Sequence, residues 1–161
     1  MLWVRCLMIA ITLSVPQLCL ADDALDAFVG EYPFGQKNGR TVFDIPKVRD
    51  SMQKLLGNER TKLVRSFATG VPIEAVQDGN FGRLIYVWQC QQHNCPKQAG
   101  LFLRSNSEIV AACFSDLDDK SVATTDWIGQ DWKTTTKGFD CGAGDEALKR
   151  LNDAKASAHG R

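Results

Sequence analysis

The hydrophobic pattern after residue 44 is helical. Asp44 can cap a first turn in which Pro46 is tolerated, and apolar residues then recur every three or four positions until Gly57. Asn58 can cap a second helix that runs until Gly70. The apolar positions are Val48, Met52, Leu55 and Leu56 in the first helix, and Leu63, Val64 and Phe67 in the second. We therefore predict two short helices whose common apolar side needs a partner.

From residue 71 onward the pattern is that of strands and turns. Asp78-Gly79, a strong hairpin signal, separates one pair of apolar segments, and Ser105-Asn106-Ser107 separates another. The run LIYVW, residues 84–88, predicts a strand that is mostly buried. The predicted strands span residues 71–77, 83–89, 99–104, 108–115 and 122–128.

The C-terminal part predicts one more helix. Residues 145–154 place Leu148 and Leu151 on an inward face, and residues 155–161 are predicted to form a loose tail. Residues 22–43 mix acids, glycines and aromatics and indicate no element. Helices followed by a run of antiparallel strands are typical of the α+β class, so we predict an antiparallel sheet of about five strands with helices packed on one face.

The N-terminus has the pattern of an export signal. Arg5 is followed by an apolar run, Cys6 to Val15, which is too short to span a bilayer. Cys19-Leu20-Ala21 fits a small-x-small cleavage site. We predict that residues 1–21 are a signal peptide, that cleavage occurs near Ala21, and that residues 22–161 form a single periplasmic domain. A buried N-terminal helix is the alternative.

Composition narrows the class of partner. The chain has 19 Lys+Arg and 19 Asp+Glu, a neutral balance that gives no electrostatic case for nucleic acid. No later apolar run is long enough for membrane insertion. The signal peptide would remove Cys6 and Cys19 and leave an even number of cysteines, which in an exported chain favours disulfides over metal thiolates. We predict no cofactor and no metal.

The most distinctive stretch is CQQHNC, from Cys90 to Cys95, between two predicted strands. Facing residues of paired strands have Cα atoms roughly 4.5–5.5 Å apart, within the range of a disulfide, so this bridge is geometrically easy. So short a ring contributes roughly 2 kcal/mol, against roughly 3.6 kcal/mol for a longer ring such as Cys113–Cys141. The short ring would instead hold residues 91–94 in a stiff, protruding knuckle (residues 90–95), which favours binding.

Four interpretations of His93 remain open. It can be a metal ligand with Cys90 and Cys95, although no second ligand pair stands at finger-like spacing. It can serve as the base for a nucleophilic cysteine, although a disulfide would remove that thiolate. It can be an ordinary exposed loop histidine. The fourth interpretation is a plug that offers imidazole and amide hydrogen bonds to a partner's cleft.

The order of these motifs resembles a known family. The pattern C-x-x-H-x-C stands between two predicted strands, after an Asp-Gly hairpin and before a G-L-F-x-R-S-N-S hairpin. Over roughly residues 45–130 this is similar to the inhibitor of vertebrate lysozyme (Ivy) family. The resemblance implies an antiparallel sheet with helices on one side and a periplasmic inhibitor of c-type lysozymes that is not an enzyme.

The resemblance also assigns roles within the knuckle. It implies that the loop Cys90, Gln91, Gln92, His93, Asn94, Cys95 enters the lysozyme cleft, with a Cys90–Cys95 bridge and with His93 against the catalytic carboxylates. Gln91-Gln92 stands where the family pattern has Lys-Pro, and Asn94 where it has Asp. The second pair, Cys113 and Cys141, lies outside the family's core pattern, and its remoteness in sequence from the knuckle suggests a purely structural role.

Two other functions compete with inhibition. A carbohydrate- or peptidoglycan-binding module would use Trp88, Trp127 and Trp132, although we expect these residues in the core or at its rim. A regulator of the cell's own lytic enzymes would use the same knuckle. The sequence leaves a homodimer open.

Overall fold

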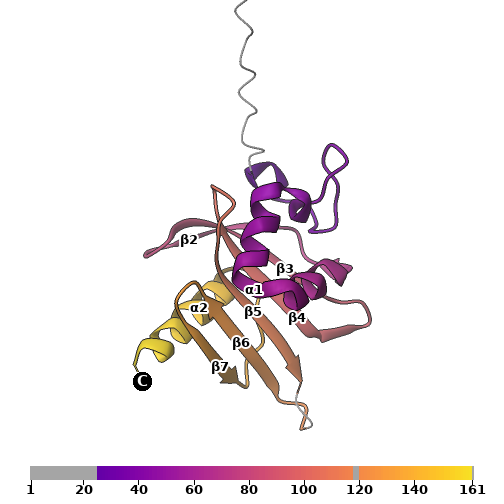
Figure 1. The fold of residues 1–161 in the computed structure, drawn as a ribbon. Coiled ribbons are helices and arrows are strands. Elements are labelled where there is room, and N and C mark those ends of the chain that lie inside the picture. The colour runs from indigo at the N-terminus through magenta and orange to yellow at the C-terminus, as the bar shows by residue number, and fades with distance from the viewer. Residues whose placement is uncertain (1–24, 118–119, 161) are drawn as a thin grey trace, which may run out of the picture.

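One antiparallel sheet forms the centre of the molecule (Figure 1). The computed structural model describes residues 25–117 and 120–160, so the predicted signal peptide lies outside the described residues. The sheet has seven strands in the order β1-β3-β4-β5-β6-β7, and β2 also pairs with β3. The strands are β1 (Thr69–Gly70), β2 (Glu74–Asp78), β3 (Gly82–Gln91), β4 (Asn94–Arg104), β5 (Ile109–Leu117), β6 (Ala123–Gly129) and β7 (Lys133–Lys137). The α+β class is therefore confirmed, with more strands than predicted.

The two extra strands have weak sequence patterns. β1 consists of Thr69 and Gly70 alone, and β7 reads KTTTK, with only Thr134 buried. Both lie at the ends of the strand order, where a short or charged strand limits pairing with other chains. Hydrophobic alternation, the signal that predicts strands, is absent from such edges.

The N-terminal helices cover one face of the sheet. Helix α1 (Pro46–Ser66) contains one non-helical residue, Gly57 with φ 72° and ψ −179°, which explains why the sequence predicts two helices. The segment before α1, for which no element was predicted, holds two short 3₁₀ helices, η1 (Leu25–Phe28) and η2 (Val42–Asp44). Asp44 accepts hydrogen bonds from the backbone and hydroxyl of Thr41, which hold its pKa at about 2.

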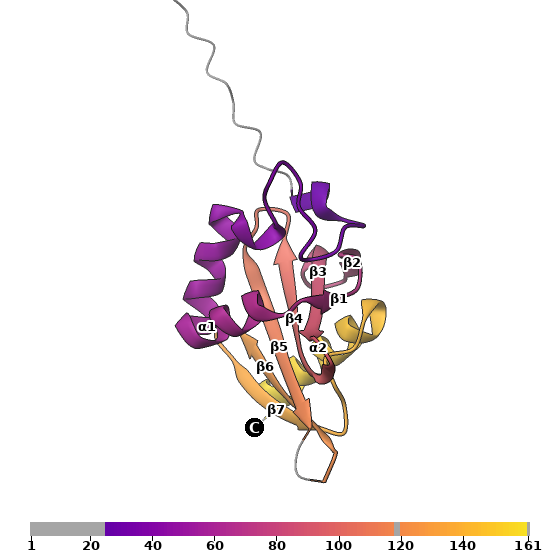
Figure 2. The same cartoon turned by 90° about the vertical axis from the view of Figure 1, so that its right-hand side faces the viewer.

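The prediction that helices pack on one face is wrong, because the sheet is covered on both faces (Figure 2). On β3, Ile85 and Val87 join the core beneath α1, while Leu84 and Tyr86 join a second core beneath the C-terminal helix. The run LIYVW is apolar at successive positions, so both sides of this strand need a cover. A single layer of helices would leave half of that run in water.

Helix α2 (Gly144–His159) supplies the second cover and is longer than predicted. It runs through residues 155–159, for which we predicted a loose tail. Two contacts hold it against the β2–β3 turn: Asn152 donates a hydrogen bond to Asp78 (2.8 Å), and the ammonium of Lys155 lies 4.5 Å from the ring centre of Phe81. Tertiary contacts of this kind extend a helix beyond the apolar pattern that predicts it.

Gly57→Ala tests the backbone requirement inside α1. Its φ and ψ lie in a region that is essentially restricted to glycine, while a Cβ at this position would meet no atom within 4 Å. We expect the free energy of unfolding to fall by about 1–3 kcal/mol, measured by urea denaturation. Gly79→Ala is the matched control, because Gly79 also has open space but no positive φ. Equal effects of the two substitutions would contradict a conformational cause.

Candidate functional site

The knuckle is the tip of the β3–β4 hairpin. Gln91 pairs with Asn94 across the two strands, and Gln92 and His93 form the turn between them. The residues from Gln91 to Pro96 are all exposed, and none of them carries a formal charge at neutral pH if His93 is neutral. The structure thus places the predicted site residues together on one protruding, uncharged hairpin tip.

A large bulge separates this tip from the rest of the hairpin. The register jumps from Cys90↔Gln98 to Gln91↔Asn94, so residues 95–97 have no partners on β3. Pro96 lies within the bulge, where a missing backbone N–H costs no ladder hydrogen bond. Bulges bend the strand that carries them, and this one redirects the tip relative to the sheet.

His93 occupies the second central position of the turn. Its φ is 62°, and Gln92 is not among the residues with positive φ, a combination that matches a type II turn. Histidine tolerates positive φ better than most residues other than glycine. Among the described residues, none forms a hydrogen bond or ion pair with the imidazole of His93.

Both predicted cysteine pairs are brought together. The Cα atoms of Cys90 and Cys95 lie 4.8 Å apart, and those of Cys113 and Cys141 lie 5.8 Å apart, and both pairs form disulfides. Cys90 is buried and Cys95 is exposed, so the short bridge ties the tip to the core. Cys113 and Cys141 are both fully buried beneath α2. Disulfides are compatible with an exported protein.

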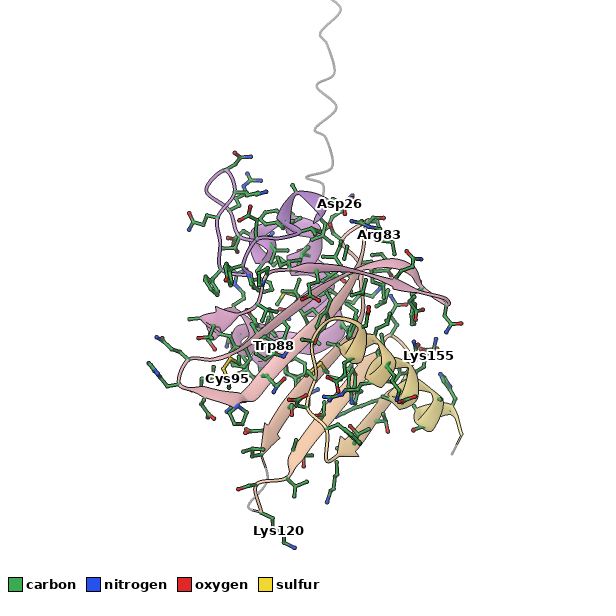
Figure 3. The ribbon with its side chains drawn as sticks, turned by 180° about the vertical axis from the view of Figure 1, so that it is seen from behind. Asp26, Arg83, Trp88, Cys95, Lys120 and Lys155 are labelled. Carbon is green, nitrogen blue, oxygen red and sulfur yellow. A yellow bond between two sulfur atoms is a disulfide. The ribbon has the colours of Figure 1, made fainter. Side chains whose placement is uncertain are left out.

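Gln98 fixes the base of the knuckle from the α2 side of the sheet. Its amide oxygen accepts a hydrogen bond from the indole of Trp88 (2.8 Å), and its amide nitrogen donates to the carbonyl of Cys95 (3.3 Å). Figure 3 shows Trp88 beside Cys95. The same nitrogen lies 3.4 Å from a carboxylate oxygen of Asp140, the residue before Cys141. Cys141 is remote in sequence from the knuckle but not in space, a relation that no sequence signal indicates.

Gln89 fixes the base from the α1 side. It is 1% exposed, and its amide nitrogen donates to the carbonyl of Val64 in the last turn of α1. The next residue, Cys90, faces Thr69 of β1. The last residues of β3 are therefore held by α1 and by β1 before the chain enters the knuckle.

The tryptophans at positions 88, 127 and 132 offer little surface for stacking a sugar. Trp127 is 1% exposed and Trp132 is 9% exposed, and both belong to the core beneath α2. Trp88 is half-buried, with its indole nitrogen bound to Gln98. The prediction that these residues lie in the core or at its rim is confirmed.

Within residues 25–117 and 120–160, no cluster of three or more His, Cys, Asp or Glu side chains is arranged to hold a metal ion. No helix in the same ranges has the length and apolar character to cross a membrane.

Comparison with protein-family models, with curated proteins and with solved structures finds no match to this chain. The resemblance to the Ivy family therefore rests on the residues of the knuckle and its flanking hairpins.

Gln98→Met tests the anchor of the knuckle. Methionine conserves the volume but leaves the Trp88 indole and the Cys95 carbonyl without this partner, so we expect the free energy of unfolding to fall by about 1–3 kcal/mol in urea denaturation. Gln130→Met is the control: Gln130 is exposed and binds only a surface carboxylate, Glu108, so its substitution should stay within about 0.5 kcal/mol. Unchanged stability of Gln98→Met would show that these hydrogen bonds do not hold the base.

Proposed function

We propose that the protein is a periplasmic inhibitor of c-type lysozyme that inserts its knuckle into the active-site cleft. One observation carries the proposal: an exposed, uncharged hairpin tip, closed by a disulfide, presents an imidazole at its apex. A convex tip of this kind complements a concave cleft. The protein needs no catalytic groups of its own to act as a plug.

The chemistry of a lysozyme cleft suits this tip. Such a cleft holds two carboxyl groups, one kept protonated as the general acid and one ionised. An imidazole between them can donate a hydrogen bond to the ionised group and accept one from the acid. The amides of Gln91, Gln92 and Asn94 offer both donors and acceptors to polar groups that would otherwise be buried unpaired.

The rigidity of the tip supports binding rather than folding. Binding is weakened by the entropy that a loop loses when it becomes ordered on contact with its partner. Here the Cys90–Cys95 bridge and the hydrogen bonds of Gln98 and Gln89 order the base of the loop before any partner arrives. A preorganised tip loses less entropy on insertion.

The two alternative functions make different predictions. A carbohydrate-binding module would need an exposed aromatic platform, and the burial of Trp127 and Trp132 argues against one built on those residues. A regulator of endogenous lytic enzymes would use the same knuckle on another glycosidase. Titration of a c-type lysozyme on a cell-wall substrate separates inhibition from the binding module. Stoichiometric loss of activity supports inhibition, and sedimentation with peptidoglycan without inhibition supports the binding module.

Removal of the imidazole should weaken inhibition strongly. His93→Gly is the preferred variant, because glycine accepts the positive φ of this position, whereas alanine would add backbone strain. A hydrogen bond to a charged group contributes roughly 1.5–3 kcal/mol, so we expect Kd for lysozyme to rise about 10- to 150-fold by calorimetry. The melting temperature should not fall.

His93→Asn serves as the matched control for this experiment. Asparagine tolerates positive φ and keeps a donor and an acceptor, so we expect a smaller loss than with glycine. If His93→Gly binds as tightly as the parent, the plug mechanism is wrong.

Opening the short ring should reduce affinity more than stability. We choose Cys90→Ala with Cys95→Ser, because position 90 is buried and position 95 is exposed. This variant should remain folded by circular dichroism at 25 °C. If about one loop conformer in ten is competent, Kd rises about tenfold. Gln92→Pro added to this open-ring variant should restore part of the lost affinity, because proline is favoured at the first central position of such a turn.

The control for the short ring is Cys113→Ala with Cys141→Ala. It removes the longer ring from the core beneath α2, so it should lower the melting temperature more than opening the short ring does. Equal affinity of the parent and the open-ring variant would show that the bridge does not preorganise His93.

A further inference from the structure

A second exposed feature lies in the segment between η1 and η2. Tyr32-Pro33-Phe34-Gly35 forms a β-turn in which the Gly35 backbone N–H donates to the Tyr32 carbonyl (2.8 Å). Proline stands at the second position, where its fixed φ suits the turn. Pro33 is buried, while the residues on either side of it are exposed. The turn is therefore held to the body of the protein by its proline and displays its two aromatic side chains.

These aromatic side chains form a stacked pair on the surface. The ring centres of Tyr32 and Phe34 lie 5.5 Å apart with an interplanar angle of 23°, and the residues are 48% and 46% exposed. The described residues include five large exposed apolar side chains, and Tyr32 and Phe34 are two of them. Stacking restricts both rings before any partner binds, so less rotamer entropy is lost on contact.

The turn is fixed beside the base of the knuckle. Pro33 packs against Gly70, because a Cβ at Gly70 would lie 3.4 Å from the proline Cδ. Gly70 faces Gln89 in the β1–β3 pair, and its neighbour Thr69 faces Cys90. Figures 1 and 3 both place the segment after η1 on the same side of the molecule as the β3–β4 tip.

Backbone hydrogen bonds hold this segment in place. Gly30 donates to the carbonyl of Ile73 (2.8 Å), and Ile73 donates to the carbonyl of Glu31 (2.7 Å). This reciprocal pair joins the residues just before the turn to the chain between β1 and β2. The aromatic pair therefore has a defined position relative to the knuckle.

The two features also share a lack of formally charged side chains. The chain is 24% charged, yet residues 32–36 contain no charged side chain and residues 91–96 contain none other than the titratable His93. Depletion of charge with enrichment of aromatic residues is the composition of the buried centre of a protein–protein interface. Aromatic residues in such centres contribute a large share of the binding energy.

We propose that the aromatic pair and the knuckle form one interaction surface, in which Tyr32 and Phe34 pack against the rim of the same lysozyme cleft that takes the knuckle. This inference rests on the proposed function. The knuckle supplies polar groups to the catalytic carboxyls, and the aromatic pair supplies apolar area beside them. Because the knuckle and the aromatic pair are both held in place before binding, their contacts add affinity with little further loss of conformational entropy.

Nitration of tyrosine tests this surface directly, because the chain has two tyrosines in contrasting environments. Tyr32 is 48% exposed, whereas Tyr86 is 1% exposed and its burial raises the pKa of its phenol well above the usual value. Tetranitromethane should therefore modify Tyr32 in the free protein. Saturation with c-type lysozyme should protect Tyr32, as measured by mass spectrometry of its peptide. An equal nitration rate in the complex would overturn the inference.

Substitution gives the second test. Tyr32→Ala and Phe34→Ala should each raise Kd for lysozyme about five- to thirty-fold by calorimetry. Phe81→Ala is the control: Phe81 lies in the β2–β3 turn, at the other end of β3 from the knuckle, where Lys155 of α2 contacts its ring, so its removal should leave Kd unchanged.

The outcomes separate this inference from the proposed function. If the parent binds lysozyme, His93→Gly weakens binding, and both Tyr32→Ala and Phe34→Ala bind as the parent does, the aromatic contact is wrong and the inhibitor function stands. If the parent does not bind lysozyme, both are wrong. Loss of affinity in the two aromatic variants, with the Phe81→Ala control unaffected, supports a single surface.

Discussion

The register of β3 against β4 is the constraint on which the candidate surface depends. The two strands pair without interruption from Leu103 opposite Ile85 to Gln98 opposite Cys90. Successive residues of this part of β3 enter opposite cores, so a slip of one residue would exchange the two sets of side chains between the α1 and α2 faces. The register thus decides where Cys90 lies, and with it the point at which the bulge and the turn begin.

Local sequence patterns predict the features that this register organises. The spacing of Cys90 and Cys95 indicates the knuckle, and the glycine at 57 indicates a break in the first helix. Contacts between distant residues leave no such pattern. Asp140 reaches Gln98 across 42 positions, and the choice of opposite faces for α1 and α2 depends on which core each helix fills. These features follow from tertiary packing, which overrides local preference.

The position of the irregular N-terminal segment also depends on contacts that no local sequence pattern predicts. Residues 29–41 have no hydrophobic period, and they are placed by non-local bonds such as the pair between Gly30 and Ile73. The Tyr-Pro-Phe-Gly turn was not predicted, and its position beside the base of the knuckle depends on the contact of Pro33 with Gly70. Binding residues are often carried by loops that a rigid scaffold positions, so the segment that the sequence predicts least can contribute to the proposed surface.

The covering of both faces of the sheet is consistent with the proposed interaction surface at a hairpin tip. Helices occupy the two faces of the sheet, which leaves strand edges and turns for a partner. At one end of β3 the β2–β3 turn is already engaged by α2, through Asn152 on Asp78 and Lys155 over Phe81. At the other end, residues 91–96 extend into solvent beside the aromatic turn. The same packing that stabilises the sheet thus leaves an exposed hairpin tip, the surface that we propose enters a cleft.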